Sequence, residues 1–298
     1  MVKIVTDSSC DIPTEIARSL SISIVPLYIQ FGDKTYRDGI DLDAEEFHQE
    51  LACSQEIPKT SVPSPGDFLA VYQDLARETD QILSIHLASG YSGTCNVANL
   101  AKSYLAGKCH VEVIDSKLVS AGLGLIVIAA AKAAQEGKNL DEIVNLVHRL
   151  IPRTHMFGKI DNIAELLKGK RFRLGRALIL LGKISTALNI KLLGEVYDGG
   201  KVRAPAYIPG EERALNNLKR RAGRFASVGE MAVAYSIKPD EAARLAELLV
   251  PLLPKKHILV TRLGCATSTY VGPGTLAMAL IEGLPDKSDC AKQARIVP

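Results

Sequence analysis

One stretch, from Gln81 to Gly107, constrains the fold of this chain more than any other. It begins with an apolar run at residues 82–87, passes through a turn rich in glycines and hydroxyls at 88–94, and continues with apolar residues at helical spacing. A short apolar run between polar residues is typical of a buried strand, and a glycine such as Gly107 commonly ends a helix. The stretch therefore predicts a strand, a tight turn and a helix in succession.

The turn in this stretch has the composition of an anion site. The first turn of a helix leaves backbone N–H groups unpaired, and the helix dipole places roughly half a positive charge there. Gly93 lets the backbone approach a ligand closely, and Ser92 and Thr94 add neutral hydrogen-bond donors. We expect a carboxylate or a phosphate to bind here. The alternative is that Ser89 or Ser92 only caps the helix.

The glycine-containing turns resemble three better-known motifs but match none of them. Gly90-Tyr91-Ser92-Gly93 lacks the spacing of the G-x-S-x-G hydrolase elbow. The turn also lacks the glycine–lysine pattern of a nucleotide-binding loop, and Gly122 and Gly124 lack the third glycine of a dinucleotide fingerprint. We therefore expect no cofactor.

The composition excludes several classes of protein. With 298 residues, 47% of them hydrophobic, the chain can bury the cores of two domains. A net charge of +3 and the absence of Trp argue against a nucleic-acid partner. None of the six cysteines forms a C-x-x-C pair, which argues against zinc and redox motifs. Scattered thiols without a targeting segment favour the cytoplasm. The longest apolar run, Leu123 to Ala131, is too short for a membrane span.

The first half of the chain alternates between strand and helix patterns. Such alternation through Leu150 predicts a mainly parallel sheet with helices on both faces. The strands are expected at 2–5, 23–30, after the turn at 31–36, 82–87 and 111–114, and the helices at 13–20, 42–53, 67–78, from 94 toward 107, 119–135 and 141–150.

Polar side chains also stand at two other points of this half. Asp7 and Ser8 follow the first strand, at the sheet edge where ligands bind in open α/β folds, although Asp7 satisfying its own loop and Asp11 capping the next helix are equally good interpretations. Three prolines between 58 and 65 predict a rigid loop. Ser64 is suited to be an N-cap, which leaves Thr60 and Ser61 for a ligand.

The second half has a different pattern. Strands at 190–196 and 202–207 flank Asp198-Gly199-Gly200 and predict an antiparallel hairpin. A glycine turn at 267–275 is expected to open a helix at 276–281. The remaining expected elements are strands at 155–160, 231–237 and 258–261, and helices at 162–168, 211–226 and 240–253. We predict an α/β protein with a boundary near Pro152, giving domains 1–152 and 153–283 with a mixed or antiparallel second sheet, and a polar tail at 284–298.

Four motifs, in this order and spacing, resemble the DegV family across nearly the whole chain. They are Val5-Thr6-Asp7-Ser8, Lys59-Thr60-Ser61-Val62-Pro63-Ser64, Ser92-Gly93-Thr94 and Gly272-Pro273-Gly274. The resemblance implies a bacterial, cytoplasmic fatty-acid-binding protein whose two α/β domains enclose the acyl chain. It also implies a fatty acid kinase as a partner, to which the carrier presents the acyl carboxylate.

The resemblance assigns roles to individual residues. It implies that Thr60 and Ser92 hold the carboxylate, with Asp115 in a supporting strand-end motif. Two departures stand out: Tyr270 occupies a position where the family usually has histidine, and Lys170 interrupts a G-G-R motif that retains Arg171. Tyrosine can donate a hydrogen bond, but it is not cationic near neutral pH. The departures therefore bear more on phosphoryl transfer than on lipid binding.

The chemistry of these residues suits a fatty acid. An apolar tunnel gains about 0.8 kcal/mol per buried methylene, and hydroxyls and helix N–H groups can compensate the carboxylate. We expect ligand contacts from Thr60, Ser61, Ser92, Gly93, Thr94 and Tyr270, and support from Asp7, Ser8, Asp115 and Arg171. The stretches 24–29 and 174–188 are candidate walls, or plain core. Arg171, Arg173 and Arg176 are a candidate docking face for a kinase, or a solvated helix face.

The rival hypothesis is a serine hydrolase or acyltransferase with Ser92 as nucleophile. That chemistry requires a histidine base with an oriented acid. The six histidines are not in glycine-rich turns, and His86 falls inside a predicted core strand. We therefore predict a monomeric, non-catalytic carrier without metal or catalytic residues.

Overall fold

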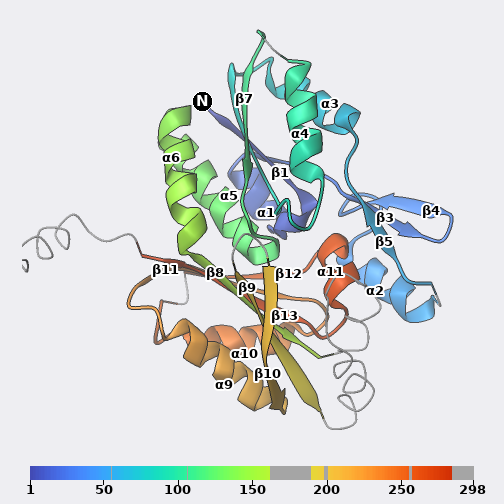
Figure 1. Ribbon diagram of the computed structural model, residues 1–298, viewed down its shortest axis with the longest axis vertical. Helices are drawn as coiled ribbons and strands as arrows, with labels where there is room; N and C mark the ends of the chain where they lie inside the picture. Colours follow the sequence, from blue (N-terminus) through green and yellow to red (C-terminus); the bar gives the residue numbers. More distant parts are fainter. Residues whose placement is uncertain (55, 106, 162–188, 198–200, 255–256, 284–298) are drawn as a thin grey trace, which may run out of the picture.

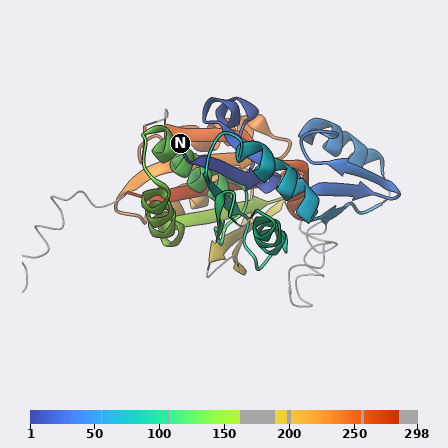
Figure 2. The ribbon, with the colours of Figure 1, turned by 90° about the horizontal axis from the view of Figure 1, so that it is seen from above.

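The computed structural model describes the chain up to Gly283, except for residues 55, 106, 162–188, 198–200 and 255–256 (Figure 1). This part of the chain forms a mixed α/β structure with a parallel sheet, a mixed six-stranded sheet and a small antiparallel sheet. In Figure 1 the parallel sheet lies above the six-stranded sheet. Seen from above in Figure 2, the small sheet projects to one side. The predicted α/β fold class is confirmed.

The parallel sheet has the strand order β2-β1-β6-β7, and every pairing in it is parallel. Its two faces use alternate residues of each strand, as the two-residue period of a strand requires. On β1, Ile4 contributes to the core with α5 and α6, whereas Val5 packs with α3 and α4 on the other face. The bounds are β1 Lys3–Asp7, β2 Ile22–Val25, β6 Gln81–His86, β7 His110–Asp115, α1 Thr14–Ser19, α3 Pro65–Leu75, α4 Thr94–Ser103, α5 Ser120–Gln135 and α6 Leu140–Leu150.

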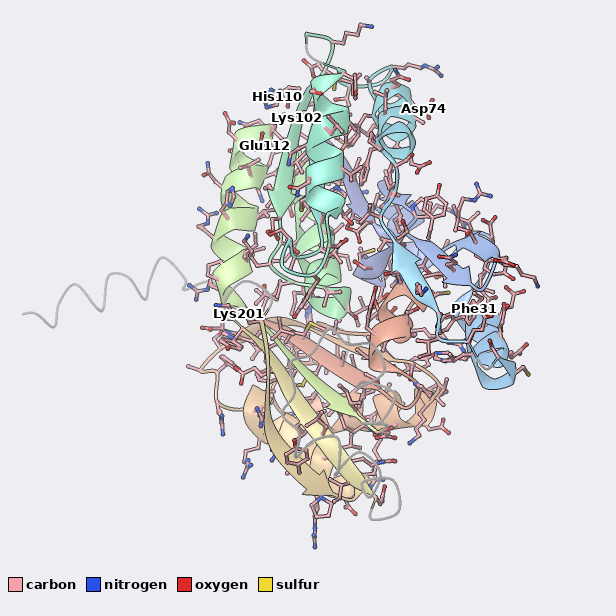
Figure 3. The ribbon with its side chains drawn as sticks, turned by 45° about the vertical axis from the view of Figure 1, so that its right-hand side comes forward. Phe31, Asp74, Lys102, His110, Glu112 and Lys201 are labelled. Atoms are coloured by element: carbon pink, nitrogen blue, oxygen red, sulfur yellow. The ribbon has the colours of Figure 1, made fainter. Side chains whose placement is uncertain are left out.

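The edge of this sheet is protected by charge. β7 is an edge strand, and Lys102 of α4 pairs with Glu112 of β7 across 3.3 Å, with His110 at the start of the same strand (Figure 3). Charged side chains on an edge strand discourage pairing with another chain.

Two predictions for the first half are wrong in detail. The expected single strand at 23–30 is divided between two sheets, because Pro26 has no N–H to donate and interrupts the ladder between β2 and β3. The expected proline loop contains the strand β5, whose residues lie between Pro58 and Pro63 and so keep their N–H groups for pairing with β3. The small sheet has the order β4-β3-β5, with β3 Tyr28–Phe31, β4 Lys34–Arg37, β5 Lys59–Ser61 and the helix α2 Ala44–Cys53 beside it.

The second sheet has the strand order β10-β9-β8-β13-β11-β12. Only the pairing of β11 with β12 is parallel, so the predicted mixed sheet and the predicted β9–β10 hairpin are confirmed. Helices α9 and α10 pack on one face of it. The bounds are β8 Thr154–Ile160, β9 Ile190–Tyr197, β10 Lys201–Pro209, β11 Val228–Tyr235, β12 Ile258–Arg262, β13 Leu276–Glu282, α9 Glu211–Ala222 and α10 Pro239–Leu249.

The end of the described chain corrects a further prediction. Residues 276–281 form not a helix but β13, and the helix α11 (Cys265–Val271) precedes the glycine turn instead of following it. A short run that is apolar at every position does not distinguish a buried strand from a buried helix. Gly272 and Gly274, with φ of 74° and 78°, end α11 and turn the chain into β13.

Helix α5 joins the two sheets through one core. Its residues are buried almost all round, because it packs on the parallel sheet with one side and on alanines of β11 and β13 with the other. A Cβ on Gly124 would lie 2.6 Å from the carbonyl oxygen of Cys10, so only glycine permits this approach of α5 to the short 3-10 helix η1 (Ser8–Cys10). The two sheets lie on either side of Pro152 in sequence, while the domain limits of 152 and 153 stay a prediction.

Candidate functional site

The turn between β6 and α4 leaves the first turn of the helix without a side-chain cap. The N–H groups of Tyr91 and Ser92 both bond to the carbonyl of Ala88, at 2.9 and 3.3 Å, which closes the turn. Gly93 is the N-cap of α4 and no side chain caps the helix, so neither Ser89 nor Ser92 has the capping role considered as an alternative. The first amides of α4 therefore remain available as donors.

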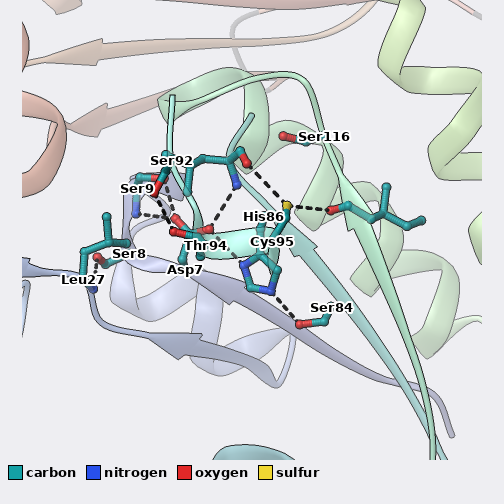
Figure 4. A network of polar contacts seen from close by, with 12 residues as sticks. Asp7, Ser8, Ser9, Leu27, Ser84, His86, Ser92, Thr94, Cys95 and Ser116 are labelled. Atoms are coloured by element: carbon teal, nitrogen blue, oxygen red, sulfur yellow. Dashed lines mark hydrogen bonds and ion pairs between the residues drawn. The ribbon is translucent and has the colours of Figure 1, made fainter. Parts of the chain in front are cut away.

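Ser92 and Thr94 form a hydroxyl pair at this helix start. Their oxygens lie 2.9 Å apart; Thr94 is fully buried and Ser92 is half-buried (Figure 4). One hydroxyl hydrogen is used in the bond between them, which leaves the other to donate to a third group.

Thr60 and Tyr270 form a second hydroxyl pair. Thr60 lies on β5 and Tyr270 in the last turn of α11, 210 positions away, and their side-chain oxygens are in hydrogen-bond contact. Ser61 is the next residue of β5 and points to the opposite face, as strand geometry requires. Its side chain is exposed and bonds only weakly, at 3.4 Å, to the carbonyl of Val62. The structure thus pairs Thr60 with Tyr270 and leaves Ser61 outside this pair.

Asp7 is the buried anchor of the carboxyl edge of the sheet (Figure 4). Its Oδ1 accepts from the N–H and hydroxyl of Ser9, and its Oδ2 accepts from Leu87 N at 3.1 Å and from Nδ1 of His86 at 2.9 Å. The ends of the neighbouring strands β1 and β6 are thereby tied together just before the Ser92 turn. The interpretation that Asp7 satisfies its own loop is confirmed, but its bond to His86 could not be read from the sequence pattern.

The His86 ring continues this network into the core. Its Nε2 lies 2.7 Å from Ser84 Oγ, which also accepts from the hydroxyl of Tyr72 at 2.7 Å. Asp7, His86 and Ser84 are therefore connected in the order of a catalytic triad, but all three are fully buried. Both nitrogens of His86 are engaged within the core, so this histidine does not serve Ser92 as a base in the arrangement described.

Ser8 and Asp11 contact α11 and its surroundings rather than an open pocket. Ser8 Oγ donates to Asp38 Oδ2 at 2.8 Å and accepts from Leu27 N at 3.0 Å.

Asp11 does not cap α1, whose N-cap is Pro13. Its Oδ1 instead accepts from Gly264 N at 2.9 Å. Asp38 accepts from Cys265 N at 3.1 Å and from Ala266 N at 3.3 Å. Sequence reasoning missed Asp38 entirely, because its partners in α11 are more than 220 positions away.

The family can be assigned by comparison. The family model described as "Uncharacterised protein, DegV family" matches residues 1–283. The chain belongs to the DegV family. A DegV domain-containing protein of Deinococcus radiodurans is 33% identical over 285 residues, which cover 94% of this chain and 98% of the relative.

Solved structures extend the likeness to the fold of this DegV protein. The fatty-acid-binding DegV family protein of Thermus thermophilus shares 30% identity with a TM-score of 0.82, over 95% of this chain and 99% of that one. The Fatty Acid Kinase (Fak) B3 protein of Streptococcus pneumoniae, solved with linoleic acid, shares 23% identity with a TM-score of 0.81, over 95% and 100% of the two chains. The predicted family and fold are confirmed by these matches. No helix in the described ranges is long and apolar enough to cross a membrane.

Of the two remaining predicted residues, Asp115 lies in the described part of the chain and Arg171 does not. Asp115, at the end of β7, accepts from Lys117 N at 2.8 Å and pairs with the Lys117 ammonium. Partial burial raises the pKa of Asp115, but the bonds from Lys117 and Ser89 outweigh it and hold this pKa below its usual value. Asp115 therefore lies beside Ser89, at the start of the turn that carries Ser92. Arg171 lies outside the described residues, as do the predicted helix at 162–168, the wall at 174–188, Arg173 and Arg176.

The two hydroxyl pairs have the same hydrogen-bonding chemistry. Thr60, Tyr270, Ser92 and Thr94 donate and accept hydrogen bonds without carrying a fixed charge. The Ser92–Thr94 pair and the uncapped amides of α4 form a group of donors of the kind that holds a carboxylate by hydrogen bonds. Gly93, which is exposed at the N-cap, leaves open space where a side chain would stand.

Proposed function

We propose that this protein binds a long-chain fatty acid between its two halves, the proposed domains 1–152 and 153–283. Thr60 and Ser92 hold the carboxylate by their hydroxyls, with the amides at Gly93–Thr94 and the hydroxyl of Tyr270 beside them. The observation that carries this proposal is the contact between Thr60 and Tyr270, because it joins two predicted head-group residues from opposite halves. The fatty acid named for the Thermus thermophilus relative supports the same ligand class.

The energetics of such a site are balanced by neutral donors. Each buried methylene contributes about 0.8 kcal/mol, so an acyl chain of ordinary length supplies most of the affinity. A carboxylate buried without partners would cancel that gain. The second hydrogen of the Ser92–Thr94 pair and the uncapped amides of α4 supply partners on one side of the site. Thr60 and Tyr270 supply hydroxyls on the other.

The proposed role is that of a cytoplasmic, monomeric carrier without catalytic residues. The resemblance of the motifs, together with the kinase named for the Streptococcus pneumoniae neighbour, supports a fatty acid kinase as the protein partner. The hydrolase alternative is less favoured, because His86 is buried and committed to Asp7 and Ser84.

Native mass spectrometry of the purified protein tests the ligand class. We expect a mass increment that matches one fatty acid per chain, identified after extraction. A protein that is empty and takes up no added palmitate or oleate would refute the proposal. Labelling of Ser92 by a fluorophosphonate probe would instead support the hydrolase.

A further inference from the structure

Two buried carboxylates from the first half of the chain hold the start of α11. Asp11 accepts from the N–H of Gly264, and Asp38 accepts from the N–H groups of Cys265 and Ala266. The carbonyl of Asp11 also accepts from the hydroxyl of Thr261, at 2.6 Å. Three successive amides of one short helix are therefore fixed by two side chains that lie far away in sequence.

Anchoring this end of α11 sets the position of the other. The helix has seven residues, about two turns, so its two ends are only about 10 Å apart. Tyr270 lies in its last turn and contacts Thr60. Gly272, with φ of 74°, ends the helix directly after it. A movement at Gly264 to Ala266 would therefore separate Tyr270 from Thr60.

The two carboxylates lie in surroundings that disfavour negative charge. The titratable groups facing them are Cys10 of η1 and Cys265 of α11, and Asp7 at the end of β1 lies near the Cys10 thiol. Ser8, Ser120 and Thr267 are the polar neighbours from η1, α5 and α11. Arg262 of β12 is directed to Glu45 of α2, at 3.5 Å, and to the carbonyl of Ser236, at 3.3 Å.

Asp11 is the member of the pair suited to bind a proton. Burial, with a smaller contribution from Asp38, raises its pKa to about 7 against the opposing effects of Ser120, Gly264 and Thr267. Burial also raises the pKa of Asp38. Within the described part of the chain, the Oδ2 atom of Asp11 is buried and has no hydrogen-bond partner. The same holds for the hydroxyl oxygen of Ser120, which lies nearby but does not meet the geometry of a hydrogen bond to Asp11. A proton on Oδ2 would leave Oδ1 free to accept from Gly264.

We propose that Asp11 and Asp38 form a proton-dependent clasp that positions Tyr270, with one bound proton favouring the closed arrangement. The consequence for a fatty acid rests on the proposed function; the clasp itself does not. The sign follows from linkage: in an open clasp Asp11 is solvated and its pKa falls toward its ordinary value near 3.8, so the closed form binds the proton more tightly. The closed form is therefore weakened as pH rises from about 4 to about 7, by at most about tenfold per pH unit, and changes little above that window.

Hydrogen exchange of the ligand-free full chain tests the clasp directly. Protection of the amides of 264–266, corrected for the intrinsic exchange rate, is measured from about pH 5 to about pH 8. We expect protection to fall by about tenfold or more across this range in the parent and to be flat in Asp11→Asn. Asp43→Asn is the matched control: Asp43 caps the exposed helix α2 through Glu45 N and Glu46 N, so this variant should keep the parental pH dependence.

A second variant keeps the test decisive if Asp11→Asn does not fold. Asp38→Asn removes the neighbouring negative charge, so the fall in protection should move to lower pH. A parent with flat protection, or an Asp11→Asn protein with the parental pH dependence, would overturn the clasp.

The release of bound palmitate separates the clasp from the proposed function. We expect release from the loaded parent to be several-fold faster at about pH 8 than at about pH 5.5, and this difference to vanish in Asp11→Asn. Failure to bind palmitate would refute the carrier and leave the exchange result to decide the clasp. Binding with exchange that does not depend on pH would refute the clasp and leave the carrier. If hydrogen exchange at 264–266 depends on pH but palmitate release does not, the clasp does not position Tyr270 at the ligand.

Discussion

His86 donates from Nδ1 to Asp7 Oδ2 across 2.9 Å, and both side chains are fully buried. The same carboxylate accepts the N–H of Leu87 and, through its other oxygen, two donors of Ser9. One side chain thus satisfies the polar groups of two neighbouring strand ends immediately below the Ser92 turn. Removing this side chain would leave several buried hydrogen-bond donors without an acceptor.

The first prediction concerns this network. Asp7→Ala should lower the free energy of unfolding by about 3 kcal/mol or more, because a buried hydrogen-bonded pair is broken. Urea denaturation measures the change. The control is Asp74→Ala, which breaks an exposed pair with Arg77 and should cost less than about 1 kcal/mol. Equal losses in the two variants would contradict the anchoring role of Asp7.

The second prediction concerns the carboxylate site. Ser92→Ala and Thr60→Ala should each weaken palmitate binding by about tenfold, or ~1.4 kcal/mol, because each removes one donor to a charged group. Titration calorimetry measures the affinity, and the melting temperature should be unchanged. Ser103→Ala at the other end of α4, whose hydroxyl bonds to the carbonyl of Leu100, should bind as the parent does. Parental affinity in the double variant would show that the head-group site lies elsewhere.

The third prediction separates the two roles of Tyr270. Tyr270→Phe removes the hydroxyl that contacts Thr60 and should weaken palmitate binding by several-fold. Tyr270→His should retain binding and improve the protein as a substrate carrier for a purified bacterial fatty acid kinase, because histidine can become cationic beside a forming acyl phosphate. The readout is acyl phosphate formed per minute at saturating carrier. A histidine variant no faster than the parent would argue that this position does not limit phosphoryl transfer.

The fourth prediction concerns a buried ionic cluster beside the glycine turn. Asp161 pairs with Lys159 at 2.7 Å, Lys191 at 3.0 Å and Lys238 at 2.6 Å, and a Cβ on Gly274 would collide with its carboxylate. Asp161→Asn should destabilise the protein by about 3 kcal/mol near pH 7, because Lys159 and Lys191 are almost fully buried and each would lose a carboxylate partner, while Lys159 keeps its pair with Glu241.

The same cluster gives the loss a defined pH dependence. Burial raises the pKa of Asp161, but the lysines outweigh it and hold this pKa below its ordinary value. Stability from a lowered carboxyl pKa is present above the unfolded value and is lost as pH falls through the folded one. The gap between parent and Asp161→Asn should therefore narrow in acid, below about pH 4, when measured by denaturation at each pH. Glu136→Gln, which disrupts the exposed pair with Lys138, is the control and should show little change at any pH.

Local patterns predicted most of the architecture because the elements have strong periods and end signals. The strand, turn and helix at 81–103 and the cap at Ser64 could be predicted from neighbouring residues alone. The run at 276–281 could not be assigned, because it is apolar at every position and its strand form is decided by pairing with β8 and β11. Tertiary pairing, not propensity, fixes this element.

The candidate site shows the same division. Ser92 and Thr94 are two residues apart and could be associated by spacing, whereas Thr60 and Tyr270 came together only through a family resemblance. The position of Asp11 just before α1 predicted the wrong partner. Asp11 does not cap α1 but accepts a hydrogen bond at the start of α11. Asp38 carried no local signal. Residues that act across the chain are predictable only once the strand order is known.

The central position of β13 has a consequence for how the protein is made. This strand lies between β8 and β11, so the six-stranded sheet remains divided into two fragments with bare edges until residue 282 has left the ribosome. The parallel sheet, complete by residue 115, can assemble much earlier during synthesis. A nascent chain that stalls before Leu276 would expose both unpaired edges, together with the side of α5 that packs on the alanines of β13. Such a chain would be a natural target for chaperones and proteases.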